Sequence, residues 1–147
     1  MSSSRAQSEK FVTKIFNQQV YHFFLMPQIL PYKIKTIFTG IQSSPEVEEY
    51  IGKKLGFLEK LLSHYAENTN EALFEVEVGK TGAHHQKGDV YRAEINFIAG
   101  GVRLRAVAIQ ESLNAALDEA KDEMQREMRR HKEKQIAKDR RPARKQT

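Results

Sequence analysis

Hydrophobic and polar residues alternate in four stretches of the chain, which is the pattern of a β-strand with one buried face. These stretches are residues 33–39, 73–78, 91–97 and 102–108. In the second stretch Glu75 and Glu77 alternate with apolar residues, so we expect one side of the sheet to face water. Gly100 and Gly101 separate the last two stretches and predict a tight hairpin, since glycine reaches the positive φ that such turns need.

Two further stretches repeat apolar residues every three or four positions, as an amphipathic α-helix does. The first is predicted at about residues 45–65, where Ser43 or Ser44 can act as N-cap and Pro45 suits the first helical position. The second is predicted at residues 111–134. Its buried stripe contains Leu113, Leu117, Ala120, Met124 and Met128.

The order of these elements is β-α-β-β-β-α, which predicts an α+β fold with a four-stranded sheet and two helices packed on one face. The opposite face of the sheet would carry charges of both signs. Pairs between neighbouring strands would contribute a few tenths of a kcal/mol each. These charged residues are Glu75, Glu77, Arg92, Glu94, Arg103 and Arg105.

The length of 147 residues predicts one domain flanked by two different ends. Residues 1–31 begin with a polar segment and are predicted to be a poorly ordered extension rather than a signal peptide or a membrane anchor. Residues 32–134 form the predicted folded domain, and residues 135–147 a basic tail. No apolar run approaches the roughly 20 residues that span a bilayer.

Positive charge is concentrated at the C-terminal end of the chain. The formal net charge is +5 overall, whereas residues 121–147 contain eleven Lys or Arg and five acidic residues, a net of +6. Arg126, Arg130 and Lys134 recur every four residues, roughly 200° around the helix from the buried stripe, and Arg129 lies beside them. Such a row can follow a phosphate backbone without reading bases. A solvated helix face with a disordered tail is the alternative.

The residue types exclude or disfavour several kinds of chemistry. There is no cysteine, which excludes disulfides, thiolate nucleophiles and Cys-ligated metals. His84 and His85 are adjacent in a loop and are predicted to be solvated rather than metal ligands. No phosphate-binding loop, nucleophile elbow or poised acid and base is present. We therefore expect neither an enzyme nor a cofactor nor a small-molecule substrate.

Several motifs are shared with a known family. SSPEVEEYIGKKLGFLEKLL follows the first strand, and HHQKGDVYRAEI and AALDEAKDEMQREM follow later. Over residues 32–134 the chain resembles the ribosome hibernation-promoting factor and ribosome-associated inhibitor A family of bacteria and plastids. The resemblance implies a fold similar to a double-stranded RNA-binding domain. It also implies binding of ribosomal RNA on the small subunit near the decoding centre.

The resemblance also implies contact residues on both helices. Arg126 and Arg130 match basic positions of the family on the last helix, and Arg129 and Lys134 are further candidates. Lys54 and Lys60 match basic positions on the first helix. Two other basic positions of the family are occupied here by Glu123 and Phe57, so those two contacts are predicted to differ.

We predict a cytoplasmic translation inhibitor of stressed or stationary cells that blocks tRNA and mRNA binding. The chain resembles a short form of the family, which lacks the separate domain that pairs ribosomes, so we expect a monomer off the ribosome. Two alternatives stay open: a general double-stranded RNA-binding protein, and a protein-interaction module that modulates a sigma factor.

Overall fold

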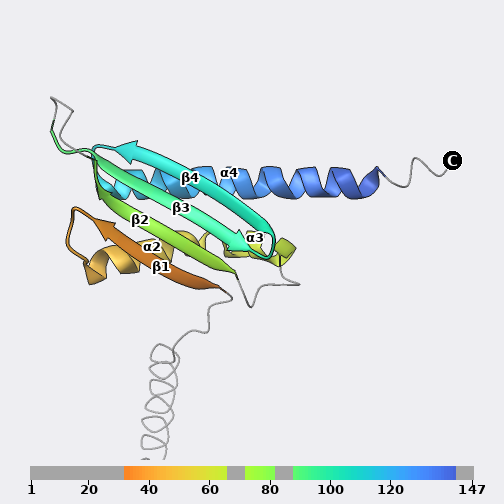
Figure 1. Ribbon diagram of the computed structural model, residues 1–147, viewed down its shortest axis with the longest axis horizontal. Helices are drawn as coiled ribbons and strands as arrows, with labels where there is room; N and C mark the ends of the chain where they lie inside the picture. Colours follow the sequence, from red (N-terminus) through yellow and green to blue (C-terminus); the bar gives the residue numbers. More distant parts are fainter. Residues whose placement is uncertain (1–31, 66–71, 82–87, 142–147) are drawn as a thin grey trace, which may run out of the picture. The chain divides into compact units, whose positions relative to one another are not determined.

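The computed structural model describes residues 32–65, 72–81 and 88–141 (Figure 1). The predicted extension at residues 1–31 and the His84–His85 pair lie outside this part. The strands are β1 (Lys33–Thr39), β2 (Leu73–Lys80), β3 (Tyr91–Ala99) and β4 (Val102–Gln110). The helices are α2 (Pro45–Gly56), α3 (Glu59–Leu62) and α4 (Leu113–Arg140).

The four strands form one sheet in the order β1-β2-β3-β4. β1 and β2 are parallel, since α2 and α3 connect them, and the other neighbours are antiparallel. The hairpin between β3 and β4 turns at Gly100 and Gly101, and Gly100 has a φ of 57° as predicted. Gly79 lies opposite Thr39, and a Cβ at Gly79 would come within 2.1 Å of the Thr39 carbonyl oxygen. Only glycine therefore allows β1 and β2 to pair there.

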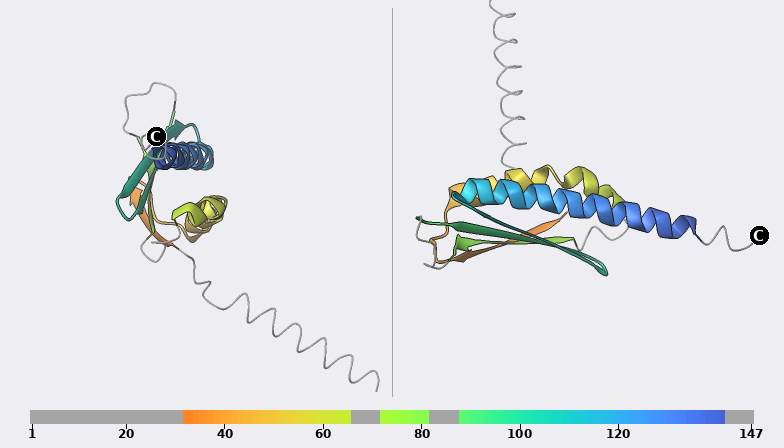
Figure 2. Two further views of the ribbon diagram at one scale, coloured as in Figure 1. Left: turned by 90° about the vertical axis from the view of Figure 1, so that its right-hand side faces the viewer. Right: turned by 90° about the horizontal axis from the view of Figure 1, so that it is seen from above.

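α2, α3 and α4 cover the same face of the sheet, with α2 and α3 beside α4 (Figure 2). The core between these layers consists of the predicted inward residues of the strands and the predicted stripes of the helices. On α4 the stripe from Leu117 to Met128 is buried, and Leu113 packs against its edge. The predicted α+β architecture is confirmed.

The prediction of one continuous helix at residues 45–65 was wrong. α2 ends at Gly56, Phe57 and Leu58 form a turn, and the short α3 follows. The backbone N–H groups of Phe57 and Leu58 donate to carbonyls three residues back, Lys54 at 3.2 Å and Leu55 at 2.9 Å, which tightens the chain at this point. Both residues keep right-handed helical dihedrals, so the apolar stripe continues across the break.

The predicted end of the last helix at residue 134 was also wrong, because α4 extends to Arg140. The helix begins where the Ser112 hydroxyl accepts a hydrogen bond of 3.2 Å from the Ala115 N–H. The apolar stripe ends at Met128, but the following Lys, Glu, Gln, Ala and Arg residues all have high helix propensity. Pro142 has no backbone N–H to donate to the Lys138 carbonyl, which accepts a hydrogen bond of 3.1 Å from the Arg141 N–H instead. Part of the predicted basic tail is therefore helical.

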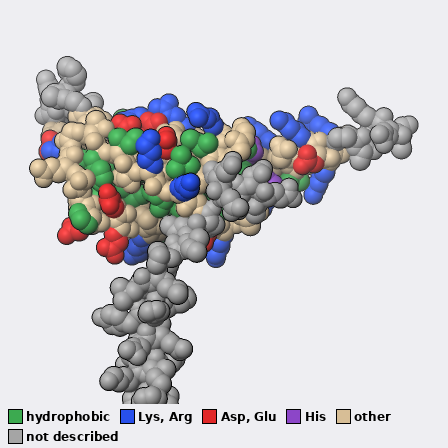
Figure 3. Space-filling view, turned by 60° about the horizontal axis from the view of Figure 1, so that its bottom comes forward, with side chains coloured by type: hydrophobic (Ala, Val, Ile, Leu, Met, Phe, Trp, Pro, Cys, Tyr) green, Lys and Arg blue, Asp and Glu red, His purple; other side chains and the backbone are tan. Residues whose placement is uncertain are grey.

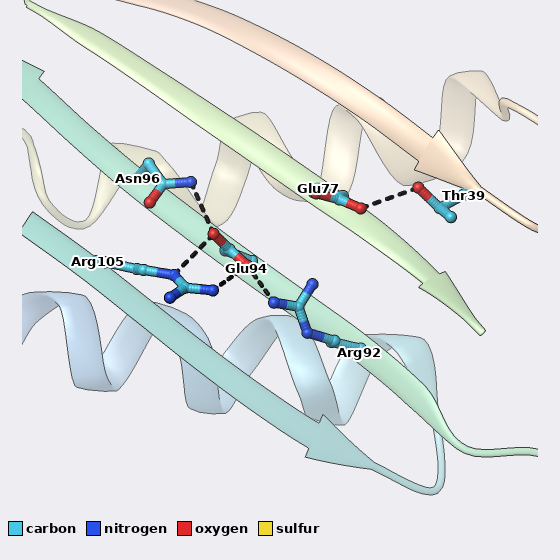
Figure 4. A network of polar contacts seen from close by, with 6 residues as sticks. All are labelled: Thr39, Glu77, Arg92, Glu94, Asn96 and Arg105. Atoms are coloured by element: carbon cyan, nitrogen blue, oxygen red, sulfur yellow. Dashed lines mark hydrogen bonds and ion pairs between the residues drawn. The ribbon is translucent and has the colours of Figure 1, made fainter. Parts of the chain in front are cut away.

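The sheet face opposite the helices carries a polar network centred on Glu94 (Figure 4). The Glu94 carboxylate accepts hydrogen bonds of 2.8 and 3.0 Å from Arg105 on β4 and one of 3.1 Å from Asn96. It also pairs with Arg92. Glu94 is only 8% exposed although it lies on the outward side of β3. The predicted pairing of opposite charges between strands is confirmed at Glu94 and Arg105.

Candidate nucleic-acid interface

α4 has two parts that differ in burial. Residues up to Met128 supply the buried stripe, whereas no residue from Arg129 to Arg140 is buried. The second part extends past the end of the sheet (Figures 1 and 2). Lys and Arg side chains predominate on this projecting end, while both signs of charge mix over the body of the domain (Figure 3). The projecting end therefore offers positive charge to a partner without opening the core.

Arg126 and Arg130 are exposed on α4 but each is held by an acidic neighbour. Arg126 donates to the Glu123 carboxylate, and Arg130 pairs in the same way with Glu127. The hydrogen bond from Arg126 to Glu123 raises the pKa of the Arg126 guanidinium. These carboxylates fix the two guanidiniums on the helix surface and offset part of their charge. A phosphate that binds here competes with Glu123 and Glu127.

Arg129, Lys134 and Lys60 are exposed, and the described part of the chain gives them no ion-pair partner. Arg129 and Lys134 lie on α4 on either side of Arg130, and Lys60 lies on α3. Exposed and unpaired cations meet a phosphate without first breaking an internal contact. These three positions agree with the sequence prediction of outward-pointing charge.

Lys54 has a different environment from the one predicted for an RNA ligand. Its ammonium lies 2.9 Å from the Asp118 carboxylate of α4. The Tyr50 hydroxyl donates to the same carboxylate at 2.7 Å. Burial raises the pKa of Asp118, but the hydrogen bonds from Lys54 and Tyr50 outweigh it and leave that pKa below its ordinary value. Lys54 therefore joins α2 to α4 and is less available to a partner than Lys60.

A second contact joins the other end of the helical layer. The Tyr65 hydroxyl, just after α3, donates to the Met128 carbonyl at 3.2 Å, and its ring stacks on His131 with centroids 5.8 Å apart. The Tyr50 and Tyr65 contacts keep α2 and α3 aligned beside α4. Lys54 thus lies near the start of α4, while Arg126, Arg129, Arg130 and Lys134 follow along its later turns.

The sequence prediction missed Phe57 and Lys121 as parts of this helical surface. Phe57 lies one position before Leu58 of the buried stripe, so its place on the helical wheel already indicated an outward side chain. Lys121 follows Ala120 of the α4 stripe, and only 15% of its side chain is exposed. The Lys121 ammonium lies 5.4 Å from the centroid of the Phe57 ring, and this contact depends on how α2 packs against α4, which no local pattern states.

Other kinds of site are not seen in the described residues. Within residues 32–65, 72–81 and 88–141, no group of three His, Asp or Glu side chains could hold a metal ion. No helix of this part is both long and apolar enough to cross a bilayer.

Comparisons with known proteins concern the family and the fold of the chain. Residues 34–136 match the family described as sigma 54 modulation protein / S30EA ribosomal protein. The fold is similar to the crystal structure of the N-terminal domain of Protein Y from Thermus thermophilus, with a TM-score of 0.52 and 25% identity over 66% of this chain and 94% of that one. A ribosomal subunit interface protein from Coxiella burnetii gives a TM-score of 0.49 and 13% identity over 68% of this chain and 97% of that one. No curated protein sequence matches significantly.

Proposed function

The chain belongs to the sigma 54 modulation protein / S30EA ribosomal protein family, and from this membership we propose that it is a ribosome hibernation factor. Proteins of this family are ribosome-associated modulation proteins, and we expect no enzymatic activity of this chain. The proposed binding site is the RNA of the small ribosomal subunit near the decoding centre. There the domain would occupy the space of tRNA and mRNA and inhibit translation in stressed or stationary cells. We place this activity in the cytoplasm and expect a monomer off the ribosome.

The observation that carries this proposal is the separation of roles along α4. The buried stripe ends at Met128, and the helix continues for about three further turns with exposed cations. Apolar packing does not require this continuation, so its charged side chains are available to bind a partner. An exposed, rigid row of Lys and Arg suits a phosphate backbone.

The contact residues have different parts in the proposal. Arg129, Lys134 and Lys60 contact phosphates directly, since they are exposed and carry no internal ion pair within the described residues. Arg126 and Arg130 contact phosphates once their ion pairs with Glu123 and Glu127 are broken and replaced by contacts with the RNA. Lys54 positions α2 against α4 through Asp118.

Sedimentation with small subunits tests this proposal. We expect the double variant Arg126→Glu and Arg130→Glu to lose co-sedimentation almost completely, because the change replaces two attractions to phosphate by two repulsions. Binding of the unchanged protein should weaken steeply as salt rises. Unchanged co-sedimentation of the double variant would contradict the assignment of α4 as the interface.

A matched control has the same change in net charge on the other side of the domain. Lys33 and Arg103 are exposed on the outer face of the sheet, and the described residues give them no ion pair. The variant Lys33→Glu and Arg103→Glu should co-sediment nearly as the unchanged protein does. Equal losses in the two variants would indicate a response to overall charge rather than a specific face.

Two further outcomes separate this function from its alternatives. Equal affinity for a plain RNA duplex and for small subunits would favour a general double-stranded RNA-binding protein. The family description also names sigma 54 modulation, so a direct role in transcription is the second candidate. Association with RNA polymerase that survives nuclease treatment would support that role.

A further inference from the structure

An aromatic side chain is exposed on the helical layer at the break between α2 and α3. The ring of Phe57 is 58% exposed, although Leu58 beside it is completely buried. Burying a phenylalanine side chain stabilises a fold, and Phe57 forgoes much of this gain. Neighbouring residues on this part of the chain, such as Leu55 and Leu58, already supply the apolar side chains of the core. The ring therefore remains available for contact with a partner.

Two cations lie over this ring, one from α2 and one from α4. The Lys54 ammonium lies 5.8 Å and the Lys121 ammonium 5.4 Å from the centroid of Phe57. Asp118 and Asp122 pair with these lysines and hold them in place. These ion pairs hold both ammoniums over the ring, and Phe57 remains 58% exposed.

Two other lysines flank the open ring along the same helical face. Lys53 precedes Phe57 by four residues and Lys60 follows it by three, and such spacings place side chains next to each other on a helix. The spacing applies across the break, because Phe57 and Leu58 keep right-handed helical dihedrals. Lys53 and Lys60 are exposed, and the described residues give them no ion pair. Lys53, Phe57 and Lys60 therefore form a series of cation, aromatic ring and cation along this face.

We propose that the Phe57 ring is a stacking platform for an unpaired RNA base, with Lys53 and Lys60 contacting the phosphates on either side. Alternation of aromatic rings and cations is how proteins bind single-stranded nucleic acid, because each base has a π-face and each nucleotide a phosphate. A purely apolar partner would not use the flanking lysines, and a fully paired helix would not present a base to the ring. This inference rests on the proposed function, since it assigns the unpaired nucleotides of the bound RNA to a particular residue.

The chain offers a direct reporter of stacking because it contains no tryptophan. In the variant Phe57→Trp the single indole occupies the proposed platform and can be excited selectively. We expect short single-stranded oligoadenylate to quench its fluorescence strongly as a base stacks on it. Inorganic polyphosphate, which has the charge but no bases, and a fully paired RNA hairpin stem should quench it weakly.

A matched control places tryptophan at an equally exposed apolar position on the opposite side of the sheet. Ile109 on β4 is 53% exposed, and Ile109→Trp should show little quenching with any of the three probes. Circular dichroism of both variants should match the unchanged protein, since each substitution is on the surface. Similar quenching of Phe57→Trp by polyphosphate and by oligoadenylate, or of both tryptophan variants by RNA, would overturn the proposal.

Affinity measurements on the same probes separate stacking from charge. Phe57→Ala and Phe57→Leu should each weaken oligoadenylate binding by about tenfold, while Phe57→Trp retains it. Polyphosphate binding should not change in any of them. If the unchanged protein binds small subunits, and Phe57→Ala binds oligoadenylate as tightly as the unchanged protein does, the stacking platform is excluded and the proposed function stands. If the unchanged protein binds neither RNA nor small subunits, both proposals fail together.

Discussion

Glu94 on the outer face of the sheet and the cation row of α4 use the same residue types for different purposes. At Glu94 the carboxylate is nearly buried, and its partners Arg92, Arg105 and Asn96 complete a closed network. On α4 the paired Arg126 and Arg130 remain largely exposed, and Arg129 follows with no ion pair in the described residues. Desolvation strengthens charge interactions, so the first cluster stabilises the fold and the second remains available to a partner.

The largest effect that separates the two clusters is expected at Glu94. Glu94→Gln removes the charge that neutralises two guanidiniums and should lower the free energy of unfolding by about 2 kcal/mol, a value reduced because Arg105 is exposed to water. Urea unfolding measures this. RNA affinity should stay within about twofold of the unchanged protein, because the network lies on the face away from the helices.

The pH dependence of stability tests whether Glu94 stabilises the fold through its charge. The hydrogen bond from Arg105 is the main cause that lowers the pKa of Glu94 from 4.5 to about 2, against the opposing effect of burial. A lowered folded-state pKa means that the unfolded chain takes up the proton first. The stabilisation is therefore complete above about pH 5 and is lost as the pH falls towards 2.

Unfolding by urea at a series of pH values checks this expectation, with Glu94→Gln as control. The difference in stability between the two proteins should disappear across that window. A difference that stays constant down to about pH 2 would show that Glu94 acts by packing rather than by charge.

A smaller effect, a gain in RNA affinity rather than a loss of stability, is expected when the acidic residues of α4 are neutralised. Glu123→Gln with Glu127→Gln frees Arg126 and Arg130 from their acidic neighbours and raises the net charge by two. RNA affinity should rise by roughly tenfold at low salt, with a steeper salt dependence. Stability should change by less than about 1 kcal/mol, since each exposed pair contributes only a few tenths. Fluorescence anisotropy with labelled RNA measures the affinity.

The smallest effect is expected at Arg129. Arg129→Gln should reduce the slope of log affinity against log salt by about one, the amount expected for one phosphate contact. Lys132→Gln is a useful comparison, because Lys132 is half-buried on the same helix. A slope that does not change in Arg129→Gln would remove this residue from the interface.

The sequence by itself determined the order of the strands and helices, the buried stripes and the outward row of cations. Apolar residues at every second position of a strand, or at every third or fourth position of a helix, are a local property of the sequence. The hydrophobic effect buries these residues wherever the strand or helix meets a core. The stripe from Leu117 to Met128 was predicted for this reason, and the hairpin at Gly100 from the positive φ that glycine reaches. The resemblance in the later motifs led to the family that the match over residues 34–136 now shows.

Only the tertiary structure decided which charges remain available. Lys54 and Asp118 are far apart in the sequence and meet because α2 packs beside α4, and Glu94 becomes buried because its partners on β3 and β4 close over it. The break at Phe57 depends on how the chain tightens after Gly56, and the stripe alone does not reveal it. Ion pairing, burial and exposure of a side chain depend on neighbours distant in sequence, so the role of a charge emerges only when the elements pack.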